Sequence, residues 1–357
     1  MKIIFLCDSN SIHSAKYVNY FIDKNYECLL LSYSNSNITK CKNYIKLSSK
    51  KVKREGGNIH YLTKVFRIAR IFYKYKPDII NSHFSYSYGF IAALAKKIAR
   101  IKAKHVVVCH GSDILKPPFR LFTQLFNRYS LINADSIIAV SDQIYDDLIS
   151  KYKINENKIY QIQYGVDKIK NIDTITKKID ILSNRPYIEN SNLDILMEII
   201  NYISKEKKIK SIFVLPGSNE FIIKNLAKKY PFLTFLPTMN HSDMIELLKN
   251  TKIYVSATKS DGTSLSLLEA MQCATIPIVS NIPSNRSWII DGVNGFLFRN
   301  KNELLYKINF ALKNYDNLGL IINLNKKIVE EKGLYNKNIK KIEKYIVFGV
   351  RASSYLI

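Results

Sequence analysis

The 357-residue chain lacks several features that would place it in a specialised class of protein. It has no run of about 18 apolar residues, so we expect no segment to span a bilayer. Its five cysteines are scattered without a C-x-x-C pair, which fits free thiols in a reducing cytoplasm. There is no D-x-D triplet and no His/Cys cluster with metal-ligand spacing, so we expect no metal or other cofactor. The zinc-finger spacing and aromatic motifs of nucleic-acid-binding proteins are missing too, so nucleic acid is not an expected partner.

The composition is that of a folded globular protein, with 47% hydrophobic and 23% charged residues. A chain of this length exceeds the usual size of one domain, so we expect two. The N-terminus, MKIIFLCDSN, has a basic residue and a short apolar run but no small-residue cleavage site. We therefore interpret it as a first strand rather than a signal peptide.

The formal net charge of +25 at pH 7 needs an explanation. An anionic membrane, an anionic substrate, nucleic acid or a general bias towards lysine could each account for it. The placement of the charge favours a membrane, because basic residues interleave with aromatic ones on an expected helix at 61–75. Such a helix could instead bury its apolar stripe and leave a solvated basic side. We expect peripheral association with the inner face of the cytoplasmic membrane, through Lys64, Arg67, Arg70 and Lys74.

Short β-rich runs alternate with helical stretches along the whole chain. Many of the apolar runs are continuous, as expected for strands that are buried on both faces of a parallel sheet. The pattern predicts an α/β fold with two Rossmann-like domains, whose ligands bind at the carboxyl ends of the strands in the cleft between the domains. Strands are expected at 2–7, 28–33, 78–83, 105–110, 136–141, 158–164, 211–217, 233–237, 252–257, 275–280 and 295–298. Helices are expected at 14–24, 61–75, 88–100, 191–205, 219–229, 241–250, 264–273 and 301–314.

The stretch after the strand at 252–257 contains the strongest candidate for a binding site. A short loop leads into a helix, and the free N–H groups of a helix N-terminus suit a diphosphate. Asp261 could cap this helix or point into the cleft. Glu269 could accept two hydroxyl hydrogen bonds, as a ribose-binding carboxylate does. Taken singly, the first could be a mere cap and the second a solvated carboxylate. The residues expected to hold the diphosphate are Gly262, Thr263, Ser264 and Leu265.

This stretch resembles the donor-binding signature of the GT-B retaining glycosyltransferases of family four, E-x(7)-E. Asp261 and Glu269 have that spacing, with aspartate in place of the family's first glutamate. The resemblance covers most of the chain. Its other matching segments are 269–271 (EAM), 276–280 (IPIVS), 291–297 (DGVNGFL), 106–113 (VVVCHGSD), 134–141 (ADSIIAVS) and 164–167 (YGVD).

The resemblance implies the GT-B fold, two Rossmann-like domains that face each other across a cleft. Residues 1–167 would form the acceptor-side domain, 168–180 a linker and 181–330 the domain that binds the nucleotide sugar. Residues 331–357 would form a helical segment that packs back towards the first domain. The implied enzyme moves a hexose or N-acetylhexosamine from a nucleotide diphosphate sugar to a saccharide acceptor, with retention and without metal. The basic helix adds the hypothesis of a lipid-linked acceptor, as in surface polysaccharide or lipopolysaccharide synthesis.

The resemblance also assigns roles to single residues. His110 would face the donor sugar, Asp261 would contact its hydroxyls, and Arg185 would neutralise the diphosphate; we expect these three to be catalytic. Two departures stand out: Asn190 replaces a lysine of the family, and the glycine-rich turn after the first strand is absent. The residues that stand in for this turn are expected to border the acceptor, and they are Asp8, Ser9, Asn10 and His13.

Other interpretations remain open. A nucleotide-sugar epimerase or a phosphorylase could have the same architecture. The substitutions at Asp261 and Asn190 also make a catalytically inactive, nucleotide-sugar-binding partner subunit conceivable. A nucleic-acid-binding protein is a further alternative, which only the net charge supports.

Overall fold

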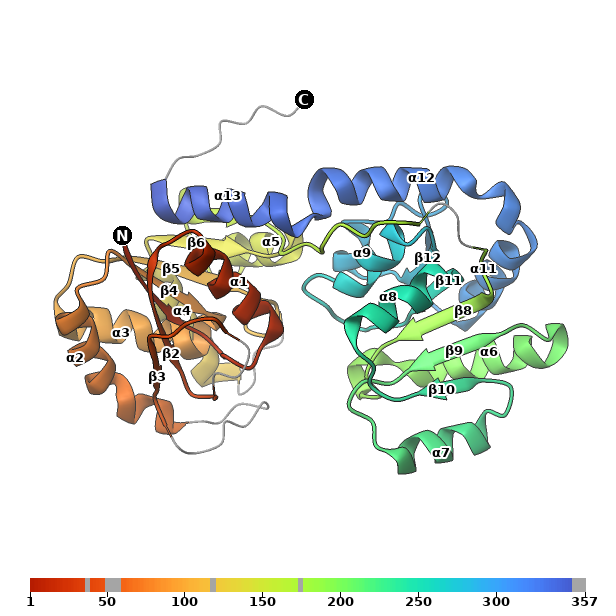
Figure 1. Cartoon of the computed structure of the whole chain (residues 1–357), viewed down its shortest axis with the longest axis horizontal. Helices are drawn as coiled ribbons and strands as arrows, with labels where there is room; N and C mark the ends of the chain where they lie inside the picture. Colours follow the sequence, from red (N-terminus) through yellow and green to blue (C-terminus); the bar gives the residue numbers. More distant parts are fainter. Residues whose placement is uncertain (36–38, 49–58, 116–119, 173–175, 349–357) are drawn as a thin grey trace. The chain divides into compact units, whose positions relative to one another are not determined.

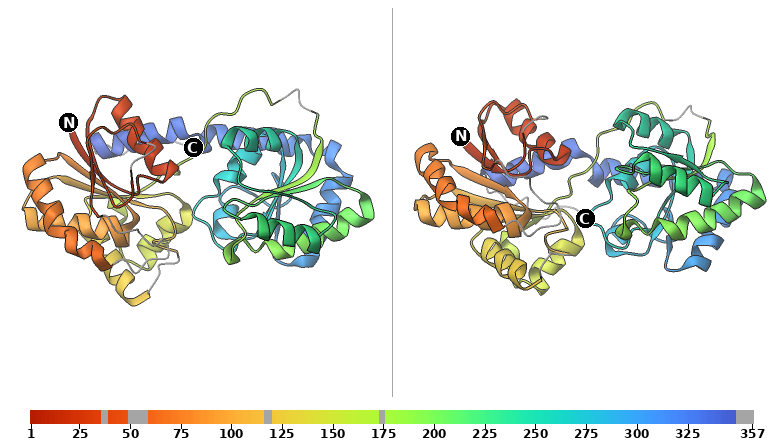
Figure 2. Two further views of the ribbon diagram at one scale, coloured as in Figure 1. Left: turned by 60° about the horizontal axis from the view of Figure 1, so that its bottom comes forward. Right: turned by 90° about the horizontal axis from the view of Figure 1, so that it is seen from below.

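A computed structural model of the chain (Figure 1) describes residues 1–35, 39–48, 59–115, 120–172 and 176–348. The chain forms two compact units. Unit 1 consists of Met1–Gln163 and the C-terminal segment that begins at Lys337, and unit 2 is Tyr164–Asn336. The sequence analysis placed these boundaries at 167 and 331. Each unit is an α/β layer structure with helices on both faces of its sheet (Figure 2), which confirms the prediction of two Rossmann-like domains.

The sheet of unit 1 is parallel throughout, with strand order β3-β2-β1-β4-β5-β6-β7. Residues alternate between its two faces: Phe5 packs against α1, whereas Ile4 and Leu6 pack with α2 and α3. The short edge strand β3 was not predicted. The strands are β1 (Lys2–Leu6), β2 (Glu27–Ser32), β3 (Tyr44–Lys46), β4 (Ile79–His83), β5 (Lys104–Cys109), β6 (Ser136–Ala139) and β7 (Ile159–Gln161).

The helices of unit 1 come from both ends of the chain. The C-terminal helix α13 is held by its Glu343, whose carboxylate accepts hydrogen bonds from Tyr20 (2.5 Å) and Tyr26 (3.0 Å). Residues 349–357 of the predicted C-terminal segment lie outside the described ranges. The helices are α1 (Ile12–Asp23), α2 (Val65–Tyr75), α3 (Phe90–Ala99), α4 (Arg120–Ile132), α5 (Asp142–Ser150) and α13 (Tyr335–Phe348), with the shorter η1 (Ile59–Lys64), η2 (Phe84–Gly89) and η3 (Glu156–Lys158).

The sheet of unit 2 is also parallel, with strand order β10-β9-β8-β11-β12-β13. Its central strand β8 begins at Ile179, inside the stretch 168–180 that we expected to be a linker, because Ile179 and Ile181 are buried and pair with β11. The strands are β8 (Ile179–Asn184), β9 (Ser211–Val214), β10 (Thr234–Leu236), β11 (Thr251–Ser256), β12 (Ile276–Ser280) and β13 (Phe296–Phe298).

Two apolar layers cover the faces of this sheet, one packed under α6 and α11 and the other under α8 and α9. The chain enters and leaves unit 2 at adjacent positions, since the Val166 N–H donates to the Gly333 carbonyl (2.8 Å) and the Tyr335 N–H donates to the Val166 carbonyl (2.8 Å). The helices are α6 (Leu193–Lys207), α7 (Glu220–Lys229), α8 (His241–Lys249), α9 (Leu265–Gln272), α10 (Pro283–Arg286), α11 (Lys301–Lys313) and α12 (Gly319–Ile328), with the shorter η4 (Glu189–Ser191), η5 (Tyr315–Asn317) and η6 (Val329–Gly333).

Candidate functional site

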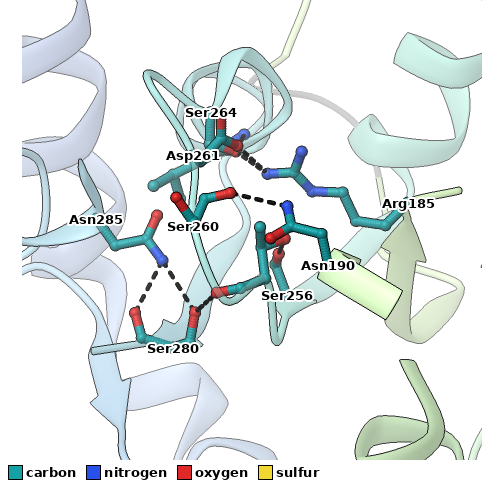
Figure 3. Close-up of polar contacts among 10 residues, drawn as sticks. Arg185, Asn190, Ser256, Ser260, Asp261, Ser264, Ser280 and Asn285 are labelled. Atoms are coloured by element: carbon teal, nitrogen blue, oxygen red, sulfur yellow. Dashed lines mark hydrogen bonds and ion pairs between the residues drawn. The ribbon is translucent and has the colours of Figure 1, made fainter. Parts of the chain in front are cut away.

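Polar side chains of unit 2 gather at the carboxyl edge of its sheet, around the N-terminus of α9 (Figure 3). Arg185 follows β8, the loop 257–264 follows β11, and Ser280 ends β12. The Ser280 hydroxyl donates to the Thr258 carbonyl (2.6 Å), which ties the loop to the neighbouring strand. Because the carboxyl ends of parallel strands share one edge, residues far apart in sequence meet here.

Arg185 forms the charged centre of this cluster. Its Nη2 donates to Asp261 Oδ2 (3.0 Å) and to Ser264 Oγ (2.5 Å), and only 16% of its side chain is exposed. Burial alone would lower the pKa of Arg185, but the neighbouring Tyr254 and Asp261 groups raise it, so the guanidinium stays charged. The sequence analysis gave Arg185 and Asp261 separate roles, whereas the structure joins them in one ion pair. A guanidinium has five N–H donors, so this pair leaves others for a ligand.

The helix α9 begins at Leu265, and its N-cap is Ser264, whose hydroxyl accepts from the Leu267 N–H (3.3 Å). Asp261 therefore does not cap this helix but points to Arg185. The N–H groups of Leu265 and Ser266, in the first turn, have no earlier carbonyl within the helix to bind. Gly262 and Thr263 lie in the loop that precedes the cap.

Asn190 fastens the loop after β11. Its Nδ2 donates to the Ser260 carbonyl (2.8 Å), and its own carbonyl accepts from the Lys259 N–H (2.8 Å). Lys259 is exposed and pairs with Glu189 at 3.3 Å. The residue that replaces the family's lysine thus holds the loop, and a different lysine lies beside it.

Glu269 lies on α9 and accepts a hydrogen bond at 2.7 Å from Nε2 of His241, the first residue of α8. Because α8 follows β10, its first residue lies near the carboxyl edge of the sheet, so the Glu269 carboxylate reaches this edge too. The glutamate is 15% exposed and the histidine 66%. His241 was missed by the sequence analysis. The signal was a histidine at the start of a helix that follows a strand.

In unit 1, His110 directly follows β5 and lies among other aromatic rings. Its ring stacks on Phe84 (centroids 4.4 Å apart) and lies 5.0 Å from the ring of His83. Burial and then the charges of His83 and His13 lower the pKa of His110 well below its usual value, so the imidazole is neutral at pH 7.

Asp113, the last residue of the H-G-S-D stretch, fixes the turn that carries His110. Its buried carboxylate accepts from the backbone N–H groups of His110 (3.0 Å), Gly111 (2.9 Å) and Ser85 (2.9 Å). The backbone at position 84 is left-handed, with a φ of 66°, and the π-helical turn η2 begins there. A left-handed backbone is costly for a non-glycine residue, π-helical turns are rare, and both concentrate at functional sites. No sequence pattern indicated this strain at Phe84.

The predicted acceptor-side residues lie in the loop between β1 and α1 and, for His13, in the first turn of α1, and they differ in exposure. Ser9 is fully buried, and its hydroxyl donates to the carbonyls of Ser34 (3.2 Å) and Asn35 (2.8 Å), so it is engaged within the protein. The Asp8 carboxylate accepts from the Asn10 N–H (3.0 Å). Asn10 and His13 are exposed.

The basic helix α2 buries an apolar stripe and exposes a basic side, which is the alternative arrangement that the sequence analysis gave. Its apolar stripe of Val65, Ile68, Ala69 and Phe72 is buried in the core of unit 1. On the other side Phe66 and Tyr73 are exposed beside Arg67, Arg70 and Lys74. Lys64, which precedes the helix, is half-buried.

Neither a disulfide nor a cluster of metal ligands occurs among the described residues. All five cysteines are buried, free thiols. In the part of the chain that the structure describes, no three His, Cys, Asp or Glu side chains come together as metal ligands would.

Comparisons with known proteins point to one family. Residues 165–331 match the model of "Glycosyl transferases group 1", and residues 12–169 match that of "Glycosyltransferase Family 4". An uncharacterized glycosyltransferase of Methanocaldococcus jannaschii is 25% identical over 335 residues, which are 90% of each chain. The capsular polysaccharide biosynthesis glycosyltransferase CapM of Staphylococcus aureus is 22% identical over 69% of this chain and 70% of its own. The fold resembles the crystal structure of Anabaena HepE in complex with UDP-glucose, with a TM-score of 0.72, 16% identity, and coverage of 96% of this chain and 98% of that one.

Proposed function

This chain belongs to the glycosyl transferases group 1 family, and we propose that it moves a hexose or N-acetylhexosamine from a nucleotide diphosphate sugar to a saccharide acceptor. We propose retention of anomeric configuration, no requirement for metal, and an acceptor that is lipid-linked at the inner face of the cytoplasmic membrane. The observation that carries the proposal is the cluster of Arg185, Asp261 and the α9 N-terminus at the sheet edge of unit 2. The UDP-glucose bound to HepE supports the choice of donor. The role of CapM in capsular polysaccharide biosynthesis supports the choice of acceptor.

The donor diphosphate meets positive charge from two sources in this proposal. Arg185 contributes a guanidinium that stays protonated despite its burial, because Tyr254 and Asp261 raise its pKa. The first turn of α9 adds about half a positive charge through the N–H groups of Leu265 and Ser266. Preorganised donors of this kind stabilise the charge that develops on a leaving diphosphate, so the reaction needs no metal ion for that purpose.

The carboxylates bind the hydroxyl groups of the donor. Asp261, held by Arg185, accepts hydrogen bonds from the sugar, and Glu269 accepts them from the ribose. His241 engages one oxygen of Glu269, which leaves the second oxygen for a hydroxyl. For His110 we propose a role in positioning the sugar as a neutral imidazole, since its lowered pKa keeps it uncharged.

The proposal is tested by nucleotide-sugar binding and turnover in the presence of a chelator. A thermal-shift screen of UDP-, GDP-, dTDP- and ADP-sugars identifies the donor, because a ligand that binds only the folded state raises its stability. We expect release of nucleoside diphosphate to continue in EDTA. Loss of activity in EDTA that magnesium restores would refute metal independence.

Substitution of the ribose-binding carboxylate tests the site itself. We expect Glu269→Gln to weaken nucleotide binding about tenfold or more, because a charge-assisted hydrogen bond contributes roughly 1.5–3 kcal/mol. Glu246→Gln, on the exposed side of α8, is the matched control and should bind as the wild type does. Equal affinity in Glu269→Gln would overturn the donor site. Binding without turnover would favour the inactive partner subunit, and conversion of donor without acceptor would favour an epimerase.

A further inference from the structure

Helix α4 exposes its apolar face and buries a largely polar one. The side chains of Leu121, Phe122 and Leu125 are 78%, 68% and 64% exposed, and that of Ile132 is 51% exposed. Positions 121, 125 and 132 follow the spacing of a single helix face, with Phe122 beside them. A surface helix ordinarily turns such a stripe inwards.

The buried side of α4 is largely polar. Thr123, Asn127 and Ser130 are buried, and the Asn127 amide donates to the Asp113 carbonyl (2.7 Å) and to the Tyr152 hydroxyl (3.1 Å). These hydrogen bonds fix which face of the helix turns inwards. The apolar stripe is therefore held outwards by specific contacts, and large exposed apolar patches mark interaction surfaces.

The surroundings of the stripe are basic and contain no acidic residue within the helices. Helix α3 packs against both α2 and α4, so the three helices form one layer on the same side of the sheet. The sequences of α2, α3 and α4 contain no Asp or Glu. Their exposed cationic residues are Arg67, Arg70, Lys74, Lys97 and Arg128, and Phe66 and Tyr73 are exposed among them.

We infer that the outward faces of α2 and α4 form a docking surface for an anionic lipid bilayer, into which Leu121, Phe122 and Leu125 insert. Exposed apolar side chains flanked by cations and aromatic rings, without carboxylates, complement an interface of anionic headgroups over acyl chains. A protein partner could also bind the apolar stripe, but the excess of cations on the three helices favours an anionic surface. Within the described ranges, none of the helices combines the length and apolar character that crossing a bilayer requires, so the contact is peripheral.

The position of α4 connects this surface to the acceptor. Helix α4 follows β5, and His110 stands at the carboxyl end of that strand. The N-terminal turns of α4, with Leu121, Phe122 and Leu125, therefore lie towards the edge of the sheet that carries His110. The inference rests on the proposed function in one respect, the lipid-linked acceptor. A membrane bound at this surface would hold that acceptor beside the sheet edge that carries His110.

Vesicle flotation tests the inference on the full-length protein. Vesicles contain either phosphatidylcholine alone or phosphatidylcholine mixed with phosphatidylglycerol. We expect the wild type to float with the anionic vesicles and to be released by high salt. The variant Leu121→Gln/Phe122→Gln/Leu125→Gln should lose about tenfold or more in partitioning, since each large apolar side chain contributes to burial. The control Ile188→Gln/Tyr202→Gln/Phe221→Gln removes three large, exposed apolar residues from unit 2 and should float as the wild type does.

Three outcomes would overturn the inference. They are a wild type that ignores anionic vesicles, an α4 variant that floats unchanged, and a wild type that self-associates through α4 without binding lipid. Circular dichroism establishes that both variants are folded. Nucleotide affinity is measured on the α4 variant and should stay unchanged, because its substitutions lie in unit 1 and the donor cluster lies in unit 2. Loss of flotation with intact nucleotide binding separates failure of the membrane surface from failure of the proposed function.

Discussion

Acid should destabilise unit 1 selectively, because this unit buries neutral histidines. His83 and His105 have no exposed surface, and burial lowers the pKa of each to about 3. In an unfolded chain the pKa of histidine is about 6.5. Between pH 6.5 and pH 3 the unfolded chain therefore binds protons that the folded unit does not. The free energy of unfolding falls as the pH falls through this window and is fully recovered above it.

The size of the effect follows from the two pKa values. Below pH 6.5 each buried neutral histidine costs about 1.4 kcal/mol of stability for each pH unit. Going from pH 7 to pH 5 therefore removes about 2 kcal/mol per histidine, or about 4 kcal/mol for both. His110 acts in the same direction, since its pKa is also lowered. Against a typical domain stability of about 5–15 kcal/mol, such a loss is readily measured.

The chain provides its own reference for this experiment. Unit 2 contains one of the six histidines, His241, and the only tryptophan, the buried Trp288. Urea unfolding followed by tryptophan fluorescence thus reports on unit 2, and far-ultraviolet circular dichroism reports on both units. We expect the circular dichroism transition to move to lower urea at pH 5, and the fluorescence transition to move much less.

A substitution identifies the groups responsible. His105 Nε2 lies 2.8 Å from Ser82 Oγ, and glutamine can keep this hydrogen bond without titrating. In His105→Gln the loss of stability between pH 7 and pH 5 should fall from about 4 to about 2 kcal/mol. The variant His241→Gln, which changes an exposed histidine, should keep the wild-type response. If His105→Gln lost as much stability as the wild type, burial of this histidine would not be the cause.

Three further substitutions test the site and its supports. Arg185→Lys cannot keep the paired geometry at Asp261, so we expect nucleotide affinity to fall about tenfold in a titration while the melting temperature changes little. Phe84→Gly relieves a left-handed backbone worth roughly 1–3 kcal/mol but removes the ring stacked on His110. We expect its turnover to fall while its melting temperature changes little. Unchanged turnover would show that neither the strained backbone nor the ring at position 84 is needed for function. Gly165→Ala places a Cβ 2.5 Å from a carbonyl oxygen at a φ of +76°, whereas Gly217→Ala, at +79°, meets no atom within 4 Å. Thermal unfolding should show a clearly larger loss for the first variant, and equal losses would exclude the clash as its cause.

Most strands of the fold could be predicted, because a strand that is buried on both faces has a continuous apolar sequence. The edge strand β3 has three residues and none is fully buried, so it has no such run. Helix α4 was also missed, although its apolar residues follow the spacing of one helix face. That spacing could have predicted the helix, but not that its apolar face turns outwards.

The types of residue in the candidate site could be predicted from motif spacing, but not their partners. Arg185 and Asp261 are 76 positions apart, and they meet because β8 and β11 are neighbours in the sheet. His241 and Glu269 are 28 positions apart and meet through the packing of α8 on α9. Spacing along one segment carries no information about such pairs.

The membership of α13 in unit 1 has a consequence for how the protein is made. The first 163 residues emerge from the ribosome long before Glu343. In the folded unit, Glu343 accepts hydrogen bonds from Tyr20 and Tyr26, near the N-terminus. During synthesis unit 1 must therefore wait, without its last helix, until all of unit 2 has emerged. Throughout this interval the nascent chain exposes the surface that α13 later covers, and unit 1 is completed only after unit 2 has emerged.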